Sequence, residues 1–503
     1  MKTWFIRFIA AILFSYISLG LSFYAYYVQP SIPLINTFIP YFSVLEPHLA
    51  AYKFQNLYTI EKFLDNSTRS DFLLDFSKAD LKYKDSVVNL AVSDNLILED
   101  RLKRWRKFKI IDDSNEIRAE FKLHGSSLYP YTMGYESFTI KSDMPVNGRV
   151  KFKLITGLEM DFNNIFYNYC GRLMNLITED TGDIVVTNSM GDYRDFFQYS
   201  VFDEDYLEQE FDLYNAKILR RLTFNSGRSN WHSSMLDGVS YNLDLDSISK
   251  KSLNLWNTFL SSPEDTHFDP TYMGRFFALL QLYNFPHQIV GNNDKWVLSQ
   301  DSLFYPVFRE EAGPYKMTAG DIENNEIFYN YYNSESLDTY KKILVSLDVF
   351  KNRNLAFKHL IEMQDLILNS YDSIYNLHKE KHKSFGPNYL KTSLDKQRIK
   401  SILKNNLEIV KNYLDSGYTI IIYDGDVLRI KSSRKNTIRV GIGSDFINFD
   451  PIIPILSENG MIKETLNEFI LEGVTNLENL VLIDSIMDKE LIFEKDYSLL
   501  ITN

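Results

Sequence analysis

The sequence predicts an α+β protein with an N-terminal transmembrane helix and a small C-terminal β module. Residues 8–28 contain no charged side chain, which is typical of a helix that crosses a membrane. Strand patterns dominate from about residue 82 to 155, and helical patterns dominate from 337 to 414. From residue 418 the pattern returns to short strands, which indicates a separate β module at the C-terminus.

The composition is that of a globular protein with a sizeable core. Of the 503 residues, 45% are hydrophobic and 24% are charged. The formal net charge of −12 argues against a broad nucleic-acid-binding surface, so we expect no nucleic-acid partner. The single cysteine, Cys170, excludes an intramolecular disulfide and a cysteine-based zinc site.

The apolar segment 8–28 has two interpretations, an uncleaved anchor and a secretory signal peptide. A signal peptide has an apolar stretch of roughly 7 to 15 residues, and this segment is longer and ends in aromatic residues. We therefore favour a single-pass anchor. Lys2 and Arg7 precede the span, so the N-terminus is expected in the cytoplasm and the bulk of the chain in the periplasm or outside the cell. The near absence of cysteine suits a bacterial cell envelope.

Changes of pattern along the chain predict five parts. They are the anchor at 1–28, a proline-containing membrane-proximal segment at 29–81, a mixed α and β domain at 82–335, a helical region at 336–417 and a β-rich module at 418–503.

The first half of the mixed domain is predicted to be mostly strands. The sharpest hairpin signal is Asn147-Gly148, because both residues tolerate the left-handed backbone of a tight turn. The expected strands are 87–92, 107–111, 117–123, 137–141, 149–155, 183–188 and 196–201.

Helices are predicted from apolar spacing and from capping residues. Asp161 and Asp269-Pro270 have the side chains of helix N-termini, and the second helix must end before Pro286. Cys170 falls on the buried face of the first of these helices. Further helices are expected at 203–213, 337–382 and 394–414, followed by strands at 419–423, 427–431 and 437–441.

Three segments carry candidate chemistry. In the first, Lys122 and His124 share one face of a strand that ends at Gly125, where the backbone can approach an anion closely. The second runs from His287 to Asn293 and Asp294, whose side-chain oxygens suit magnesium. In the third, Glu310 and Glu311 follow a strand at 303–308, where a carboxylate can complete a metal site or act as a base. Taken alone, each segment is better explained by a structural role, as a strand end, a capped turn or a surface ion pair.

Taken in order, these segments resemble the CotH (spore-coat protein H) kinase family, in particular its membrane-anchored bacterial relatives. The similarity covers about half of the chain, from residue 83 to 316, and depends on order and spacing. The matching segments are Lys122-Leu123-His124-Gly125, Ser137-Phe138-Thr139-Ile140-Lys141, Arg221-Leu222-Thr223-Phe224-Asn225, His287 with Asn293, and Pro306 with Glu310.

The resemblance implies a kinase-like mixed α/β core with a helical C-lobe, and a Mg-dependent phosphotransferase that uses ATP. It assigns Lys122, His124, Gly125, His287 and Asn293 to cofactor binding. It also assigns Asp294 and Glu310 to catalysis, and Asn293, Asp294 and Glu310 to the metal ion.

The sequence also departs from the family pattern. The family has an aspartate where this chain has Glu310, and a lysine where it has Tyr135-Glu136. Phosphoryl transfer depends on charged groups placed around the nucleotide, so such losses lower the rate strongly. Two hypotheses follow: a membrane-anchored phosphotransferase acting on a protein or an envelope glycan, and a catalytically inactive scaffold or binding protein in envelope polysaccharide assembly.

Overall fold

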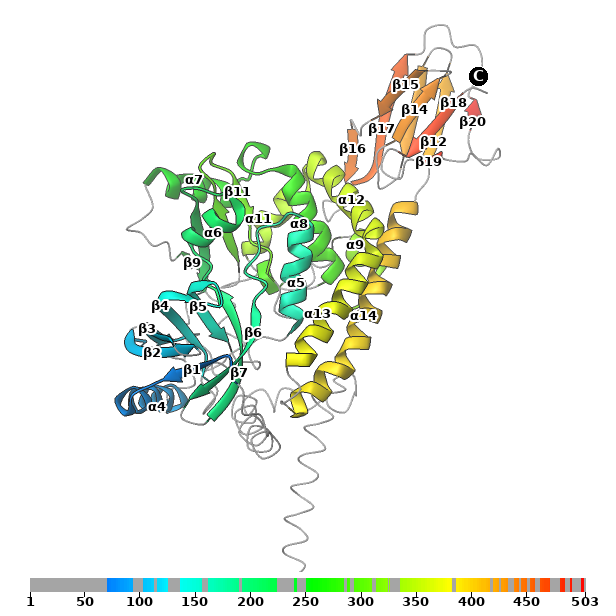
Figure 1. Ribbon diagram of the computed structural model, residues 1–503. Coiled ribbons are helices and arrows are strands. Elements are labelled where there is room, and N and C mark those ends of the chain that lie inside the picture. Colours follow the sequence, from blue (N-terminus) through cyan, green and yellow to red (C-terminus); the bar gives the residue numbers. More distant parts are fainter. Residues whose placement is uncertain are drawn as a thin grey trace, which may run out of the picture.

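A computed structural model gives the fold of the chain (Figure 1). It describes residues 70–93, 103–112, 115–124, 136–155, 162–189, 192–223, 239–241, 250–284, 287–289, 294–309, 314–323, 325, 335–381, 386–416, 419–424, 427–432, 438–442, 445–449, 453–456, 462–470, 480–484, 489–490 and 499–501. The predicted anchor at 8–28, and Asp161 and Gly417, lie outside these residues.

The N-terminal part is a closed seven-stranded barrel, in which all neighbouring strands are antiparallel except β1 and β6. Its order is β1-β2-β3-β4-β5-β7-β6. The strands are β1 (Phe72–Asp75), β2 (Arg106–Asp112), β3 (Asn115–Leu123), β4 (Phe138–Val146), β5 (Arg149–Ile155), β6 (Asp183–Ser189) and β7 (Asp192–Ser200).

Alternation of apolar and polar residues builds this barrel, since successive side chains of a strand point to opposite faces. On β3, Ile117, Phe121 and Leu123 are buried in the barrel core, whereas Lys122 lies on the outer face. Asn147 and Gly148 both have positive φ in the turn between β4 and β5, as the hairpin signal predicts.

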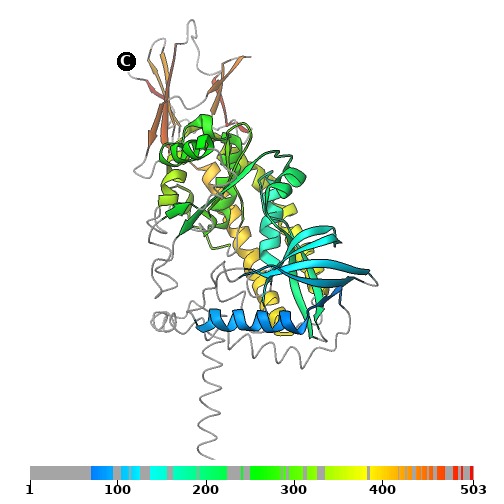
Figure 2. The ribbon, with the colours of Figure 1, turned by 90° about the vertical axis from the view of Figure 1, so that its left-hand side faces the viewer.

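Helix α4 (Lys78–Ser93) packs beside the barrel and adds Val87 and Val88 to its core (Figure 2). The predicted strand at 87–92 is therefore wrong. The spacing of apolar residues in so short a run does not distinguish a strand from a buried helix. Here the capping residues at its start favour the helix. The backbone N–H of Ser77 donates to Asp80, and the N–H of Asp80 donates to the Ser77 hydroxyl, as in a capping box.

The predicted fold class, a kinase-like mixed α/β core, is contradicted by this architecture. Phe72 on β1 pairs in parallel with Thr187 on β6, and this contact closes the sheet into a barrel. The sequence pattern identifies strands but does not show which edges pair. No helix within the described parts of the chain is long and apolar enough to span a bilayer.

A second part consists of helices around a small sheet of order β11-β10-β8-β9. The strands are β8 (Lys217–Thr223), β9 (Val239–Tyr241), β10 (Lys295–Leu298) and β11 (Phe304–Pro306). The helices are α5 (Phe162–Leu173), α6 (Glu204–Phe211), α7 (Lys250–Ser261), η4 (Asp265–His267), α8 (Pro270–Tyr283), η5 (His287–Ile289), α9 (Ala319–Glu323), α11 (Glu335–Leu344), α12 (Leu347–Glu362), α13 (Gln364–Lys381) and α14 (Gly386–Asp415).

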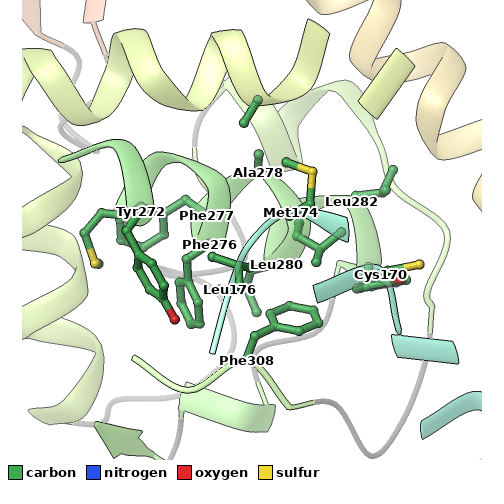
Figure 3. Packing of buried hydrophobic residues seen from close by; sticks show 14 of the residues in the cluster. Cys170, Met174, Leu176, Tyr272, Phe276, Phe277, Ala278, Leu280, Leu282 and Phe308 are labelled. Carbon is green, nitrogen blue, oxygen red and sulfur yellow. The ribbon is translucent and has the colours of Figure 1, made fainter. Parts of the chain in front are cut away.

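Helix α8 is the centre of the larger core, and Figure 3 shows its side chains packed against Met174, Leu176 and Phe308. Asp269 caps its first turn, and Asn284 ends it in the left-handed conformation, as the sequence predicts for this helix. A Cβ on Gly274 would lie 2.6 Å from the backbone of α12, so the two helices cross at closest approach there.

The C-terminal module lies beyond the end of α14 and consists, in its described residues, of strands in two sheets (Figure 1). The strands are β12 (Thr419–Asp424), β13 (Val427–Ser432), β14 (Ile438–Ile442), β15 (Asp445–Phe449), β16 (Ile453–Leu456), β17 (Ile462–Ile470), β18 (Leu480–Asp484), β19 (Lys489–Glu490) and β20 (Leu499–Ile501).

Candidate anion-binding site

Glu179 lies between the barrel and the small sheet, in the connection from α5 to β6. The adjacent Thr178 forms a parallel bridge with Phe308, and the N–H of Phe308 donates to the carbonyl of Ile177 at 2.8 Å. These backbone contacts fix the Glu179 carboxylate next to the chain that follows β11.

Two cations contact the Glu179 carboxylate. Nζ of Lys295 lies 2.5 Å from Oε1, and Nη1 of Arg309 lies 3.4 Å from the same oxygen. The N–H of Val307 donates to the carbonyl of Lys295 at 2.9 Å, which holds the two cationic segments together. Burial raises the pKa of Glu179, but the charges of Arg309, Lys295 and Lys153 outweigh burial and hold this pKa well below its usual range.

His124 approaches this group from the end of β3. Its Nδ1 lies 3.0 Å from Oγ1 of Thr139, and its backbone N–H donates to the carbonyl of Ser137 at 2.8 Å. Burial lowers the pKa of His124 well below its ordinary value, and the nearby cations Lys153 and Lys103 lower it further. The imidazole is therefore neutral at pH 7 and adds no charge to the group.

We call these six residues the Glu179 cluster: Lys103, His124, Lys153, Glu179, Lys295 and Arg309. The cluster contains four cations and one carboxylate around a neutral histidine. Within the described parts of the chain, no carboxylate lies at ion-pair distance from Lys153, although its charge acts on both Glu179 and His124. Several cations gathered at a largely buried place favour an anionic ligand.

Each of the three predicted segments contains or adjoins one described residue of the Glu179 cluster. His124 directly precedes Gly125, Lys295 directly follows Asp294, and Arg309 directly precedes Glu310. Gly125, Asn293 and Glu310 themselves lie outside the described residues, so their predicted roles stay predictions.

The contacts described for Lys122 and Asp294, two other residues predicted for the site, are with groups other than Glu179. Lys122 has its ammonium group 5.1 Å from the centroid of the Trp105 ring, on the outer face of the barrel. Asp294 is fully buried, and its Oδ1 accepts a hydrogen bond of 2.7 Å from the Tyr340 hydroxyl. The Asp294 carboxylate is thus used, at least in part, to join β10 to α11.

His287 begins η5, and only its backbone is described. The next residue, Gln288, is buried, and its Oε1 accepts a hydrogen bond of 2.8 Å from the N–H of Arg309. This contact joins the second predicted segment to the third through the backbone of a cluster residue.

Sequence reasoning missed Glu179, Lys153 and Lys295. Lys153 shares a face with Thr139 across β4 and β5, a relation that becomes visible only when the register is known. Lys295 stands one residue beyond the predicted segment, and Glu179 follows the end of a helix without any motif. The only sequence signal that pointed to this site was the set of polar residues at the ends of strands that lie far apart in the chain.

A metal site is not formed by the described residues: they contain no group of three or more His, Cys, Asp or Glu side chains placed to hold a metal ion. The arrangement is suited to binding negatively charged oxygen atoms directly.

Comparisons with known proteins give no relative. No protein-family model matches the chain, and no curated protein sequence matches it. The resemblance to the CotH family therefore stays a prediction.

Proposed function

We propose that this protein binds a phosphate-bearing ligand at the Glu179 cluster and acts as a phosphotransferase on a protein or an envelope glycan. In this proposal residues 8–28 anchor the chain in a bacterial membrane, and the site faces the periplasm or the exterior. The observation that supports it is that three cations, Lys153, Lys295 and Arg309, act on the buried Glu179 carboxylate.

The physical argument is one of charge and solvation. Lys295 and Arg309 are nearly buried, with 11% and 13% of their side chains exposed, so their charges are weakly screened. Glu179 carries one negative charge beside these two cations. Phosphate oxygens would add further negative charge, with Lys153 and Arg309 as the groups that hold them. Neutral His124 is able to donate or accept one hydrogen bond through the ring nitrogen that does not contact Thr139.

The contacts of two acidic residues favour a second function, binding of a phosphate-bearing ligand without catalysis. Asp294 accepts a hydrogen bond from Tyr340, and Glu179 is surrounded by cations, so both carboxylates have structural partners. Phosphoryl transfer with magnesium needs acidic groups that hold the ion. A non-catalytic protein that binds a phosphate-bearing ligand in envelope polysaccharide assembly needs only the cations.

The test uses the full chain in detergent, with ADP and ATP in the presence and absence of magnesium. Binding is measured by equilibrium dialysis, and turnover by release of labelled phosphate. We expect Lys153→Gln to weaken nucleotide binding at least tenfold. Lys82→Gln, which removes one charge from an exposed position of α4, is the matched control and should bind as the wild type does.

The outcomes separate the two functions. Binding with turnover supports the phosphotransferase, and binding without turnover in the presence of magnesium supports the non-catalytic protein. Absence of binding, or equal loss of binding in the Lys153 and Lys82 variants, contradicts both.

A further inference from the structure

Lysines gather on the outer face of the barrel beside the Glu179 cluster. Lys122 on β3 lies opposite Thr139 on β4, which lies opposite Lys153 on β5. In the adjacent row, Lys141 on β4 lies opposite Lys151 on β5. Alternate residues of a strand share a face, so these four lysines belong to one side of the sheet.

Trp105 holds two of these lysines close together. The ammonium groups of Lys122 and Lys141 lie 5.1 Å and 4.5 Å from the centroid of its ring. The negative face of the indole offsets part of their repulsion. Two cations are thereby kept at one place on the surface.

Carboxylates lie beside some of the cations on this face. Glu120 lies opposite Lys107 on one side and Lys141 on the other, and Lys151 is paired with Asp203. Like charges directly opposite each other in a sheet are destabilising, and here Lys141 faces Lys151. A surface that retains such repulsion is suited to an anionic partner.

We name the five lysines of these two rows the lysine rows: Lys107, Lys122, Lys141, Lys151 and Lys153. Lys107 and Lys141 are exposed, and Lys153 belongs to the Glu179 cluster. Lys122 and Lys153 are two strands apart, which corresponds to about 10 Å. The rows therefore lead from the open surface of the barrel to the cluster.

We propose that the lysine rows bind an acidic polysaccharide that lies across β3, β4 and β5. An extended polymer with regularly spaced negative groups matches cations placed at strand intervals. Lysine offers point charges, without the flat fork by which arginine grips a phosphate in two places. The inference that this surface is the acceptor site of a transferase rests on the proposed function. The inference that it binds the polymer does not depend on that function.

A nucleic acid fits this surface less well. Single-stranded nucleic acids bind where aromatic rings stack on the bases. In these rows Trp105 is already in contact with two lysines, and Tyr199, which lies opposite Lys153, is buried. The net charge of −12 also opposes a long polyanion that would extend beyond the lysine rows.

The experiment measures binding of fluorescent polygalacturonate to the full chain in detergent, without nucleotide. We expect binding that weakens as salt is raised from about 0.05 to 0.3 M, because the Debye length shortens. The double variant K122Q/K141Q should lose at least tenfold in affinity. The control K351Q/K358Q removes two lysines from α12 and should bind as the wild type does.

Neutral dextran and an oligothymidylate are the competing ligands. Equal affinity for dextran, tighter binding of the oligonucleotide, no binding of polygalacturonate, or an equal loss in both double variants would each overturn the proposal. Thermal unfolding of each variant confirms that it is folded. Because the polymer assay contains no nucleotide and the nucleotide assay contains no polymer, each proposal can fail while the other stands.

Discussion

Two places in this molecule bury cations, and they do so in different ways. Arg353 on α12 has 1% of its surface exposed, and the hydrogen-bond partners described for its guanidinium are neutral groups. Its guanidinium donates to the Tyr413 hydroxyl at 2.7 Å and to the side-chain oxygens of Gln281 and Asn325 at 3.3 Å. The Glu179 cluster contains four cations and a carboxylate instead.

The difference separates a structural charge from a binding site. The acceptors and rings around Arg353 come from α8, α12, α14 and Asn325, which lies between α9 and α11, so a single charge joins three helices and a connecting segment. In the Glu179 cluster the cations outnumber the carboxylate, and they come from the barrel and the small sheet. A buried cation that is satisfied by neutral oxygens stabilises a fold, whereas several cations gathered at one place are suited to bind an anion.

The largest effect is expected at Arg353. Arg353→Met leaves buried oxygens of Gln281, Asn325 and Tyr413 without their donor, at about 1 kcal/mol for each lost hydrogen bond. We expect the free energy of unfolding in urea to fall by about 3 kcal/mol. Nucleotide affinity under native conditions should not change. An Arg353→Met variant that keeps its stability but loses nucleotide affinity would contradict the structural role assigned to Arg353.

The next largest effect is expected at Glu179. Glu179→Gln removes the negative charge that contacts Lys295 and Arg309, and we expect a loss of about 2 kcal/mol at pH 7. The pKa of Glu179 is held below its ordinary value of 4.5, so its stabilisation is complete above pH 4.5 and is lost as the pH falls through the lowered pKa. Urea titrations below pH 4.5 should therefore show a shallower loss of stability in the variant than in the wild type. Equal slopes would mean that the carboxylate is not charged in the folded protein.

The sequence predicted local elements better than their assembly. The hairpin at Asn147-Gly148 and the caps of α8 follow from backbone preferences of single residues, and the structure agrees with both. The parallel contact of β1 with β6, which makes the barrel, joins segments far apart in the chain and has no local signal. Lys153 and Glu179 were missed for the same reason, because their proximity results from register and not from spacing.

A smaller effect is expected at His124. Its pKa is lowered below the ordinary value of 6.5, so as the pH falls below 6.5 the unfolded chain takes up a proton before the folded chain does. Wild-type stability should decline in this interval by no more than about 1.4 kcal/mol per pH unit, the slope for one proton. His124→Asn should remove that part of the decline, and the exposed His359→Asn serves as the control. If the histidine is charged in the folded protein, the two variants will give the same pH profile.

The smallest change in stability is expected at Lys153, and it bears most directly on the comparison. Lys153 acts on Glu179 through its charge but forms no ion pair with a carboxylate among the described residues, so we expect its contribution to stability to be small. We expect Lys153→Gln to change the free energy of unfolding by less than about 0.5 kcal/mol, within the range of a surface substitution. Its nucleotide affinity should fall at least tenfold. A large loss of stability with unchanged affinity would place Lys153 in the same class as Arg353, and the excess of cations would then have a structural role.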